Sequence, residues 1–232
     1  MLPGPDLIKK CPHCGKLAKQ RTIASGNNLG AQYWTDGWFF APMLPQTPQL
    51  VDCPNCKKTA WQSDFQEVDR SPSGPQASFL IWDAVDDELP LSQSAKEKLE
   101  KRKRYKEIAH LEETSADGIE RFLGDSEMLL NDEITARILL WRKWNNRRRS
   151  TPEMFPLDAQ ETENLERLLQ LLHQSNDGQF ILIAEVSRQL KHFDTARTCL
   201  SQVSSSDRYR AIKRAISSAV ALEDHHLRVV TA

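Results

Sequence analysis

Residues 11–14 read Cys-Pro-His-Cys and residues 53–56 read Cys-Pro-Asn-Cys, so the chain carries the pattern Cys-Pro-x-Cys twice. The residues between the two copies are rich in aromatic and turn-forming types, which favours β-structure over helix. Two Cys-x-x-Cys pairs in such a context are typical of a tetrahedral Zn²⁺ site with thiolate ligands. The sequence therefore predicts one zinc ion per chain, with these ligands: Cys11, Cys14, Cys53 and Cys56.

Four thiolates fill the coordination sphere of zinc and leave no position for water, so we expect a structural ion. Its binding should supply much of the folding free energy of the surrounding residues. The alternative is thiol redox chemistry, but a redox Cys-x-x-Cys pair usually stands alone at a helix N-terminus. Here there are two pairs, and Gly15 follows the first. We expect His13, between two ligands, to point to solvent.

Composition and charge narrow the class of protein. The chain has 232 residues, of which 39% are hydrophobic, and a formal net charge of -1. It therefore has no global cationic field that would attract nucleic acid. The longest strongly apolar run, residues 180–184, is far too short to span a bilayer, and residues 1–14 have no apolar leader. Cys199 lacks an obvious partner. We expect a protein of the reducing cytoplasm without a membrane partner.

The chain changes character near residue 70, and we predict an α+β fold. Residues 1–70 read as an antiparallel β zinc ribbon that contains all four predicted ligands. Residues 71–115 read as a connector with an apolar patch at 79–82 and an exposed charged helix. Residues 116–232 show the spacing of amphipathic helices.

Two helix starts are predicted in the C-terminal region. Asn131 and Asp158 are residue types that cap helix N-termini, and Asp132 and Glu133 follow Asn131 in the first turn. Trp141 and Trp144 lie three residues apart, which places them on one side of the helix after Asn131. We expect both tryptophans in the core of a helical bundle.

A predicted hairpin carries the aromatic residues of the ribbon. Asp36-Gly37 favours a two-residue type I′ turn, which pairs Trp34 with Phe39 and Tyr33 with Phe40. Aromatic side chains then lie on both faces, and so small a ribbon cannot bury both. One face should pack on the helices or on a partner. The candidate partner-binding residues are Trp34, Trp38, Phe39 and Phe40, and their alternative role is core packing.

Residues 180–203 resemble one tetratricopeptide repeat. Ala184 and Ala196 match the small residues that let two antiparallel helices of this family approach closely, and Leu190 and Phe193 match its larger apolar positions. No second copy is evident, so the resemblance implies a short helical fragment or compact bundle. Together with the ribbon, this region resembles uncharacterised bacterial proteins in which a zinc ribbon precedes tetratricopeptide-like helices.

No nucleophile elbow, phosphate loop or His-Glu-x-x-His helix is found in the sequence, and no small-molecule substrate is indicated. We therefore predict a non-catalytic adaptor or accessory subunit that binds another protein. The alternative is a nucleic-acid-associated factor that uses the ribbon and a basic cluster. The basic cluster consists of Arg142, Lys143, Arg147, Arg148 and Arg149.

Overall fold

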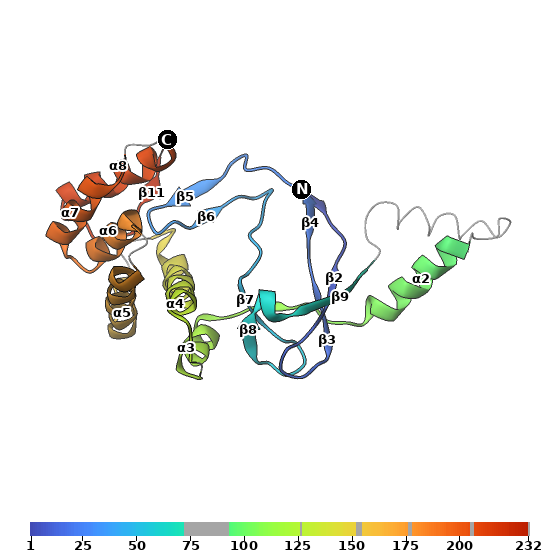
Figure 1. The fold of residues 1–232 in the computed structure, drawn as a ribbon. Coiled ribbons are helices and arrows are strands. Elements are labelled where there is room, and N and C mark those ends of the chain that lie inside the picture. Colours follow the sequence, from blue (N-terminus) through green and yellow to red (C-terminus); the bar gives the residue numbers. More distant parts are fainter. Residues whose placement is uncertain (72–92, 126, 152–154, 176–177, 205–206, 232) are drawn as a thin grey trace. The chain divides into compact units, whose positions relative to one another are not determined.

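The computed structural model describes residues 1–71, 93–125, 127–151, 155–175, 178–204 and 207–231. The fold is α+β as predicted, with small antiparallel sheets in the N-terminal part and, in the described residues, seven α-helices towards the C-terminus (Figure 1). The chain forms two compact units. The first unit contains residues 1–29 and 41–114, and the second contains residues 30–40 and 115–232. The predicted apolar patch at 79–82 lies outside the described residues.

The first unit is built from three small antiparallel sheets with strand orders β1-β4, β3-β2-β9 and β10-β7-β8. Its strands are β1 (Leu2–Pro3), β2 (Leu7–Lys10), β3 (Leu17–Gln20), β4 (Ile23–Ser25), β7 (Leu50–Asp52), β8 (Thr59–Trp61), β9 (Gln66–Arg70) and β10 (Glu112–Glu113). A 3-10 turn, η1 (Gln62–Asp64), joins β8 to β9, and helix α2 (Gln93–Lys106) follows the residues that are not described.

Two of these sheets contain matching hairpins. Strands β2 and β3 flank the first cysteine pair, and β7 and β8 flank the second. Ile8 lies opposite Lys19, and at the corresponding place in the second hairpin Leu50 lies opposite Trp61. The core beside the cysteines is small: it consists of Cys11, Val51, Cys53, Ala60 and Phe65, with Cys56 and Leu111 packed against it. Apolar burial alone therefore stabilises this unit only weakly.

A partly buried polar contact ties helix α2 to strand β9 within the first unit. The Asp69 carboxylate, on strand β9, pairs with the Lys101 ammonium and accepts a hydrogen bond from the Tyr105 hydroxyl at 2.5 Å. These two donors lower the pKa of Asp69 to about 2. The charged helix predicted from the sequence is thus tied to a strand through one carboxylate.

The second unit is mainly helical. Its helices are α3 (Ala116–Asp125), α4 (Leu130–Asn145), α5 (Ala159–Ser175), α6 (Phe180–Gln189), α7 (Phe193–Gln202) and α8 (Asp207–Ala221), with a 3-10 turn η2 (Asn146–Arg148) after α4. Helices α6, α7 and α8 lie side by side near the C-terminus (Figure 1). The core is formed by α4 to α8 and includes Trp141, Leu165, Leu168, Ala184, Ala196 and Ile216. Trp141 is buried as predicted, whereas Trp144 is half-buried.

One of the two predicted helix starts is confirmed. The Glu161 N–H donates to the Asp158 carboxylate at 2.9 Å, and the Glu161 carboxylate accepts from the Asp158 N–H at 3.0 Å. This reciprocal pair is a capping box at the start of α5. The prediction for Asn131 is wrong, because α4 begins at Leu130 and Leu129 occupies the N-cap without a side-chain hydrogen bond.

The aromatic hairpin forms, but with a different register from the predicted one. Strands β5 (Gln32–Trp34) and β6 (Phe39–Phe40) place Tyr33 opposite Phe39, one residue away from the predicted pairing. The Gly37 N–H donates to the Trp34 carbonyl at 3.0 Å, and Gly37 has a φ of 73°. This geometry is a three-residue loop that ends in a left-handed glycine rather than a two-residue type I′ turn. The Asp36 carboxylate favours the longer loop by accepting the Trp38 N–H.

The hairpin belongs to the helical unit, although the sequence placed it within the ribbon. A short C-terminal strand, β11 (Val229–Val230), pairs with β5 and makes a three-stranded sheet of order β11-β5-β6. The Asp36 side chain is fully buried and accepts a hydrogen bond from the Asn145 amide at 3.0 Å. Because α4 supplies Asn145, this contact ties the hairpin to a helix.

Candidate metal centre

The four predicted ligands converge. The sulfur atoms of Cys11, Cys14, Cys53 and Cys56 all lie within 4.8 Å of one another. The Sγ atoms of Cys11 and Cys56 are 3.9 Å apart, and those of Cys14 and Cys53 are 3.8 Å apart. A tetrahedral zinc ion with Zn–S bonds of ~2.3 Å separates its sulfur ligands by about 3.8 Å, so the donor set fits zinc. The distances are far longer than the ~2.05 Å bond of a disulfide.

The loops of residues 11–16 and 53–58, which we call the first and second knuckles, share one backbone hydrogen-bond pattern. In the first, the Cys11 N–H donates to the Lys16 carbonyl and the Gly15 N–H donates to the Cys11 carbonyl, each at 3.0 Å. In the second, the Cys53 N–H donates to the Lys58 carbonyl at 3.1 Å and the Lys57 N–H donates to the Cys53 carbonyl at 2.8 Å. Both loops therefore turn in the same way and aim their sulfur atoms at one point.

Backbone N–H groups also point at the sulfur atoms. The His13 N–H lies 3.4 Å from the Cys11 sulfur. Burial raises the pKa of the Cys11 thiol to about 12, although the N–H groups of Cys14 and His13 oppose this shift. Burial also acts to raise the pKa of the Cys53 thiol, but the N–H groups of Cys56 and Asn55, together with the thiols of Cys11 and Cys56, outweigh it and lower that pKa to about 7. Such N–H donors would stabilise thiolates bound to a metal.

The residue in the x position of each Cys-Pro-x-Cys pattern reaches across to the other hairpin. The His13 Nε2 lies 3.2 Å from the carbonyl oxygen of Thr59, the first residue of β8. The Asn55 amide nitrogen lies 3.1 Å from the carbonyl oxygen of Leu17, the first residue of β3. His13 is exposed, as expected, but its ring contacts a carbonyl group, and no pattern in the sequence indicates this contact.

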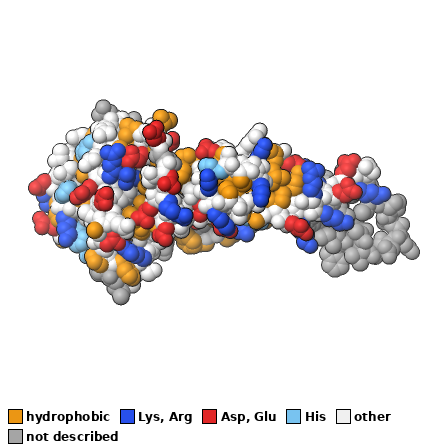
Figure 2. All heavy atoms as spheres, turned by 90° about the horizontal axis from the view of Figure 1, so that it is seen from below, with side chains coloured by type: hydrophobic (Ala, Val, Ile, Leu, Met, Phe, Trp, Pro, Cys, Tyr) orange, Lys and Arg blue, Asp and Glu red, His pale blue; other side chains and the backbone are white. Residues whose placement is uncertain are grey.

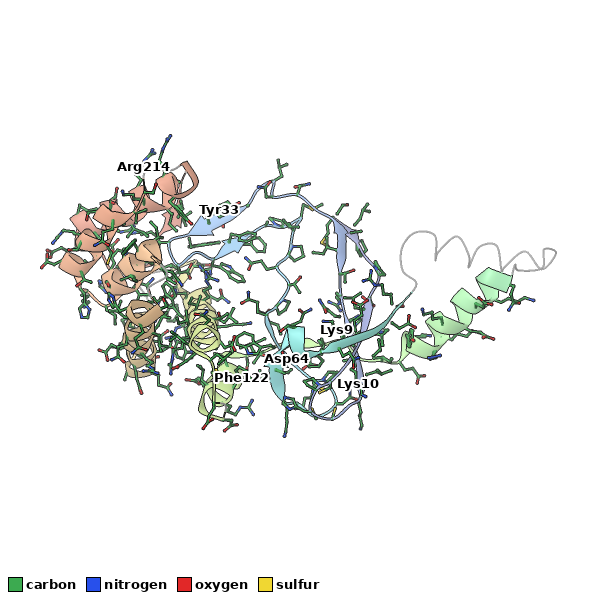
Figure 3. All side chains as sticks on the ribbon, in the orientation of Figure 1. Lys9, Lys10, Tyr33, Asp64, Phe122 and Arg214 are labelled. Carbon is green, nitrogen blue, oxygen red and sulfur yellow. The ribbon has the colours of Figure 1, made fainter. Side chains whose placement is uncertain are left out.

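The candidate partner-binding aromatic residues separate into two sets. Trp34 is buried and Trp38 is half-buried, and the Arg149 guanidinium lies 4.7 Å from the ring centroid of Trp34 and 5.5 Å from that of Trp38. These two rings thus pack within the helical unit. Phe39 is half-buried and stacks on Tyr33 with ring centroids 5.7 Å apart, while Phe40 is 54% exposed. Figure 3 labels Tyr33 on strand β5.

Most of the predicted basic cluster is occupied by contacts inside the second unit. Arg148 is buried and donates to both carboxylate oxygens of Glu161, at 2.7 and 2.5 Å. Arg149 pairs with the Asp36 carboxylate at 2.9 Å, and Arg147 pairs with that of Glu161 at the same distance. The sequence missed these carboxylates because each is distant in the chain from the arginine it binds.

The remaining two cations of the cluster lie on α4. The Arg142 Nε donates to the Asp36 carbonyl oxygen at 3.1 Å, and burial lowers the pKa of this guanidinium. Lys143 is half-buried. On the face of the molecule that Figure 2 shows, acidic and basic side chains are interspersed. The structure therefore does not bring the five cations together as one exposed patch.

A second group of metal-ligating side chains lies after α8. Asp224, His225 and His226 have ligand atoms within 4.8 Å of one another. The Asp224 carboxylate pairs with Arg228 and accepts the His226 N–H at 2.8 Å. Because it is already neutralised, this carboxylate is a poor cation ligand, and the cluster anchors the C-terminal segment instead.

Comparisons with protein-family models, curated proteins and solved structures give no match to this chain. The zinc-ribbon and tetratricopeptide descriptions therefore remain predictions from the sequence. In the described parts of the chain, no helix has both the length and the apolar character needed to cross a bilayer.

Proposed function

We propose that this chain is a non-catalytic zinc protein that serves as an adaptor or accessory subunit for a protein partner. The observation that carries the proposal is the convergence of four cysteine sulfur atoms within 4.8 Å. A zinc ion held by all four thiolates has no open position for water or a substrate, so its role would be structural. The ion would hold together a unit whose apolar core is small.

The aromatic side chains that the hairpin exposes are the proposed partner anchors, with Phe40 on one face of the sheet and Tyr33 on the other. Tyr33 is 43% exposed and Phe40 is 54% exposed, on a sheet that the helices hold in place through Asp36. Aromatic side chains on a rigid support make effective anchors, because little conformational entropy is lost when they bind. The same unit contains a cavity of about 690 Å³ with apolar lining residues that include Phe180, Val203 and Ile212. The cavity would offer an apolar groove to the same partner.

The structural role of zinc is tested by metal content. We expect one zinc per chain in the purified protein, and we expect Cys53→Ser to lose the metal and unfold the first unit while the helices of the second unit persist. Elemental analysis measures the stoichiometry, and near- and far-UV circular dichroism distinguish the two units. The control is Cys199→Ser, because Cys199 lies in the helical core and outside the tetrad. A Cys53→Ser protein with stoichiometric zinc and unchanged spectra would contradict the proposed site.

The adaptor role is tested by affinity capture from the native host with mass spectrometry. We expect a protein to co-purify with the chain after nuclease treatment, and we expect Phe40→Ser to reduce its recovery. The matched control is Leu222→Ser, which removes an apolar side chain that is 77% exposed at the end of α8. Capture that nuclease abolishes, together with salt-sensitive binding to generic DNA or RNA, would instead support the nucleic-acid alternative.

A further inference from the structure

His13 and Asn55 occupy equivalent places in the two knuckles. Each is the third residue of its Cys-Pro-x-Cys pattern, and each bonds to the first residue of the strand that leaves the other knuckle. His13 reaches the carbonyl oxygen of Thr59, and Asn55 reaches that of Leu17. Because Leu17 and Thr59 are themselves equivalent, the two hydrogen bonds are related by an approximate two-fold axis. Two chemically different side chains thus perform the same task.

We infer that His13 and Asn55 are a matched pair of positioning residues that hold the two knuckles at the separation a metal ion requires. The inference rests on the proposed zinc site but concerns residues that are not ligands. A carbonyl oxygen only accepts hydrogen bonds, so the Nε2 of His13 and the amide nitrogen of Asn55 are the donors. Each bond joins one hairpin directly to the other.

The position of these two bonds explains why they would matter. Each begins between the two ligands of one knuckle and ends just beyond the other knuckle, so together they span the group of sulfur atoms on both sides. Few large apolar side chains surround the cysteines, so polar contacts carry much of the connection between the hairpins. Besides these two bonds, residues 109–113 connect the hairpins, because they hydrogen-bond to Lys19 on β3 and pair with β7. Partners of this kind, outside the ligand shell, commonly change metal affinity by about 10–100-fold.

The structure argues against His13 as a ligand. The four thiols already complete a tetrahedral set, and the ring nitrogen of His13 that makes a contact is directed at a backbone carbonyl group. If His13 were a zinc ligand, Asn55 at the equivalent position could not share that role, because a side-chain amide is not a zinc ligand in such sites. The shared hydrogen bond accounts for both residues.

The experiment measures the rate at which the zinc-loaded 232-residue chain releases zinc to excess 4-(2-pyridylazo)resorcinol. We expect His13→Ala and Asn55→Ala each to accelerate release by about three- to tenfold, because each removes one hydrogen bond that holds the closed site. We expect His13→Asn and Asn55→His to remain within about twofold of the wild-type rate, because each places in one knuckle the donor used in the other. Lys16→Ala is the control, since Lys16 is exposed in the same knuckle.

The rescue by exchanged residues separates positioning from general destabilisation. An unchanged release rate in His13→Ala, or a His13→Asn rate as fast as that of His13→Ala, would overturn the inference. If His13→Ala retains no zinc at all, the His13→Asn variant becomes the test. Zinc retention by His13→Asn supports the inference, and zinc loss from His13→Asn overturns it. A wild-type protein that binds no zinc would instead contradict the proposed function, so the two failures are distinguishable.

Discussion

At the scale of single residues, the knuckles show where the backbone geometry is demanding. Gly15 has a φ of 70°, and the equivalent Lys57 has a φ of 57°. Glycine adopts this left-handed conformation without steric cost, whereas a side chain with a Cβ atom does not. The Lys57 ammonium pairs with Glu112, but both side chains are at least 60% exposed, so the ion pair contributes little stability. Lys57 is therefore a strained residue in an otherwise favourable turn.

We predict that Lys57→Gly stabilises the zinc-loaded protein by about 0.5–1 kcal/mol, because it relieves the left-handed strain. The free energy of unfolding from urea titration measures this effect. The matched change is Gly15→Ala, which adds a Cβ atom at the equivalent position and should destabilise the protein by a similar amount. A Lys57→Gly variant that unfolds at lower urea concentration would contradict this account of the two knuckles.

At the scale of elements, helices α6 and α7 pack through small residues. Ala184 on α6 and Ala196 on α7 are both fully buried, as the resemblance to a tetratricopeptide repeat implied. The sequence did not reveal the buried polar network on helix α6. The Arg188 guanidinium binds the Glu185 carboxylate at 2.8 and 2.6 Å, and the Trp141 indole donates to the Gln189 side-chain oxygen at 2.9 Å. Polar residues thus fill positions that periodicity alone assigns to apolar side chains.

We predict that Ala184→Leu and Ala196→Leu each destabilise the protein by about 1–3 kcal/mol, because extra methyl groups overfill the interface between α6 and α7. Thermal unfolding followed by helical circular dichroism measures the change. Ala221→Leu, at the exposed end of α8, is the control and should be near neutral. Unchanged melting midpoints for both buried substitutions would argue against close packing of the two helices.

The contact between α4 and α5 predicts a dependence on pH. The Glu133 carboxylate binds Arg167 at 3.0 Å and Arg137 at 2.9 Å. The hydrogen bond from Arg167, with further help from Arg137, lowers the pKa of Glu133 below its usual value near 4.5, although burial opposes this shift. Because the pKa is lower in the folded state, the stabilisation is complete above pH 4.5 and is lost as the pH falls through the lower folded pKa.

We therefore expect Glu133→Gln to cost about 1 kcal/mol or less at neutral pH. The difference from wild type should shrink as the pH falls below the usual pKa of the carboxyl group, because the wild-type carboxylate becomes protonated. Urea unfolding at several pH values measures this difference, and the comparison with wild type cancels any loss of zinc in acid. Glu163→Gln, at an exposed position of α5, is the control. A difference that does not change between neutral and acid pH would contradict the assigned role.

At the scale of the whole molecule, segments that are distant in sequence complete the helical unit. Residues 30–40 leave the N-terminal part of the chain to join it, and β11 returns from the C-terminus to pair with β5. Asp36 is the centre of this assembly: its buried carboxylate binds Arg149 and Asn145, and its carbonyl oxygen accepts from Arg142. One acidic residue in a turn thus neutralises part of the basic cluster.

We predict that Asp36→Ala destabilises the protein by about 3–5 kcal/mol, because it leaves the Arg149 guanidinium in a largely buried position without its carboxylate. Urea unfolding measures the cost, and a red shift of tryptophan fluorescence would report exposure of Trp34. Asp194→Ala is the control, because Asp194 is 97% exposed and its ion pair with Arg197 lies on the surface. Equal stability of the two variants would show that Asp36 does not hold the hairpin.

The sequence by itself determined the features that depend on short-range spacing. The convergence of four cysteines follows from two Cys-Pro-x-Cys patterns, and the start of α5 follows from the N-cap residue Asp158. The helical hairpin of residues 180–203 likewise follows from where small and large apolar residues recur. The capping and helix contacts join neighbours in the chain, and the two cysteine patterns have the spacing that a shared metal ion would require.

Only the tertiary structure decided which distant groups meet. The basic cluster is neutralised because Glu161 and Asp36 fold against it, and Arg149 and Asn145 bind the buried Asp36 carboxylate of the hairpin loop. The reach of His13 to Thr59 and the addition of β11 to β5 also join residues that no local pattern relates. Periodicity shows that a face is buried, but the partner that buries it is selected by packing and charge in three dimensions.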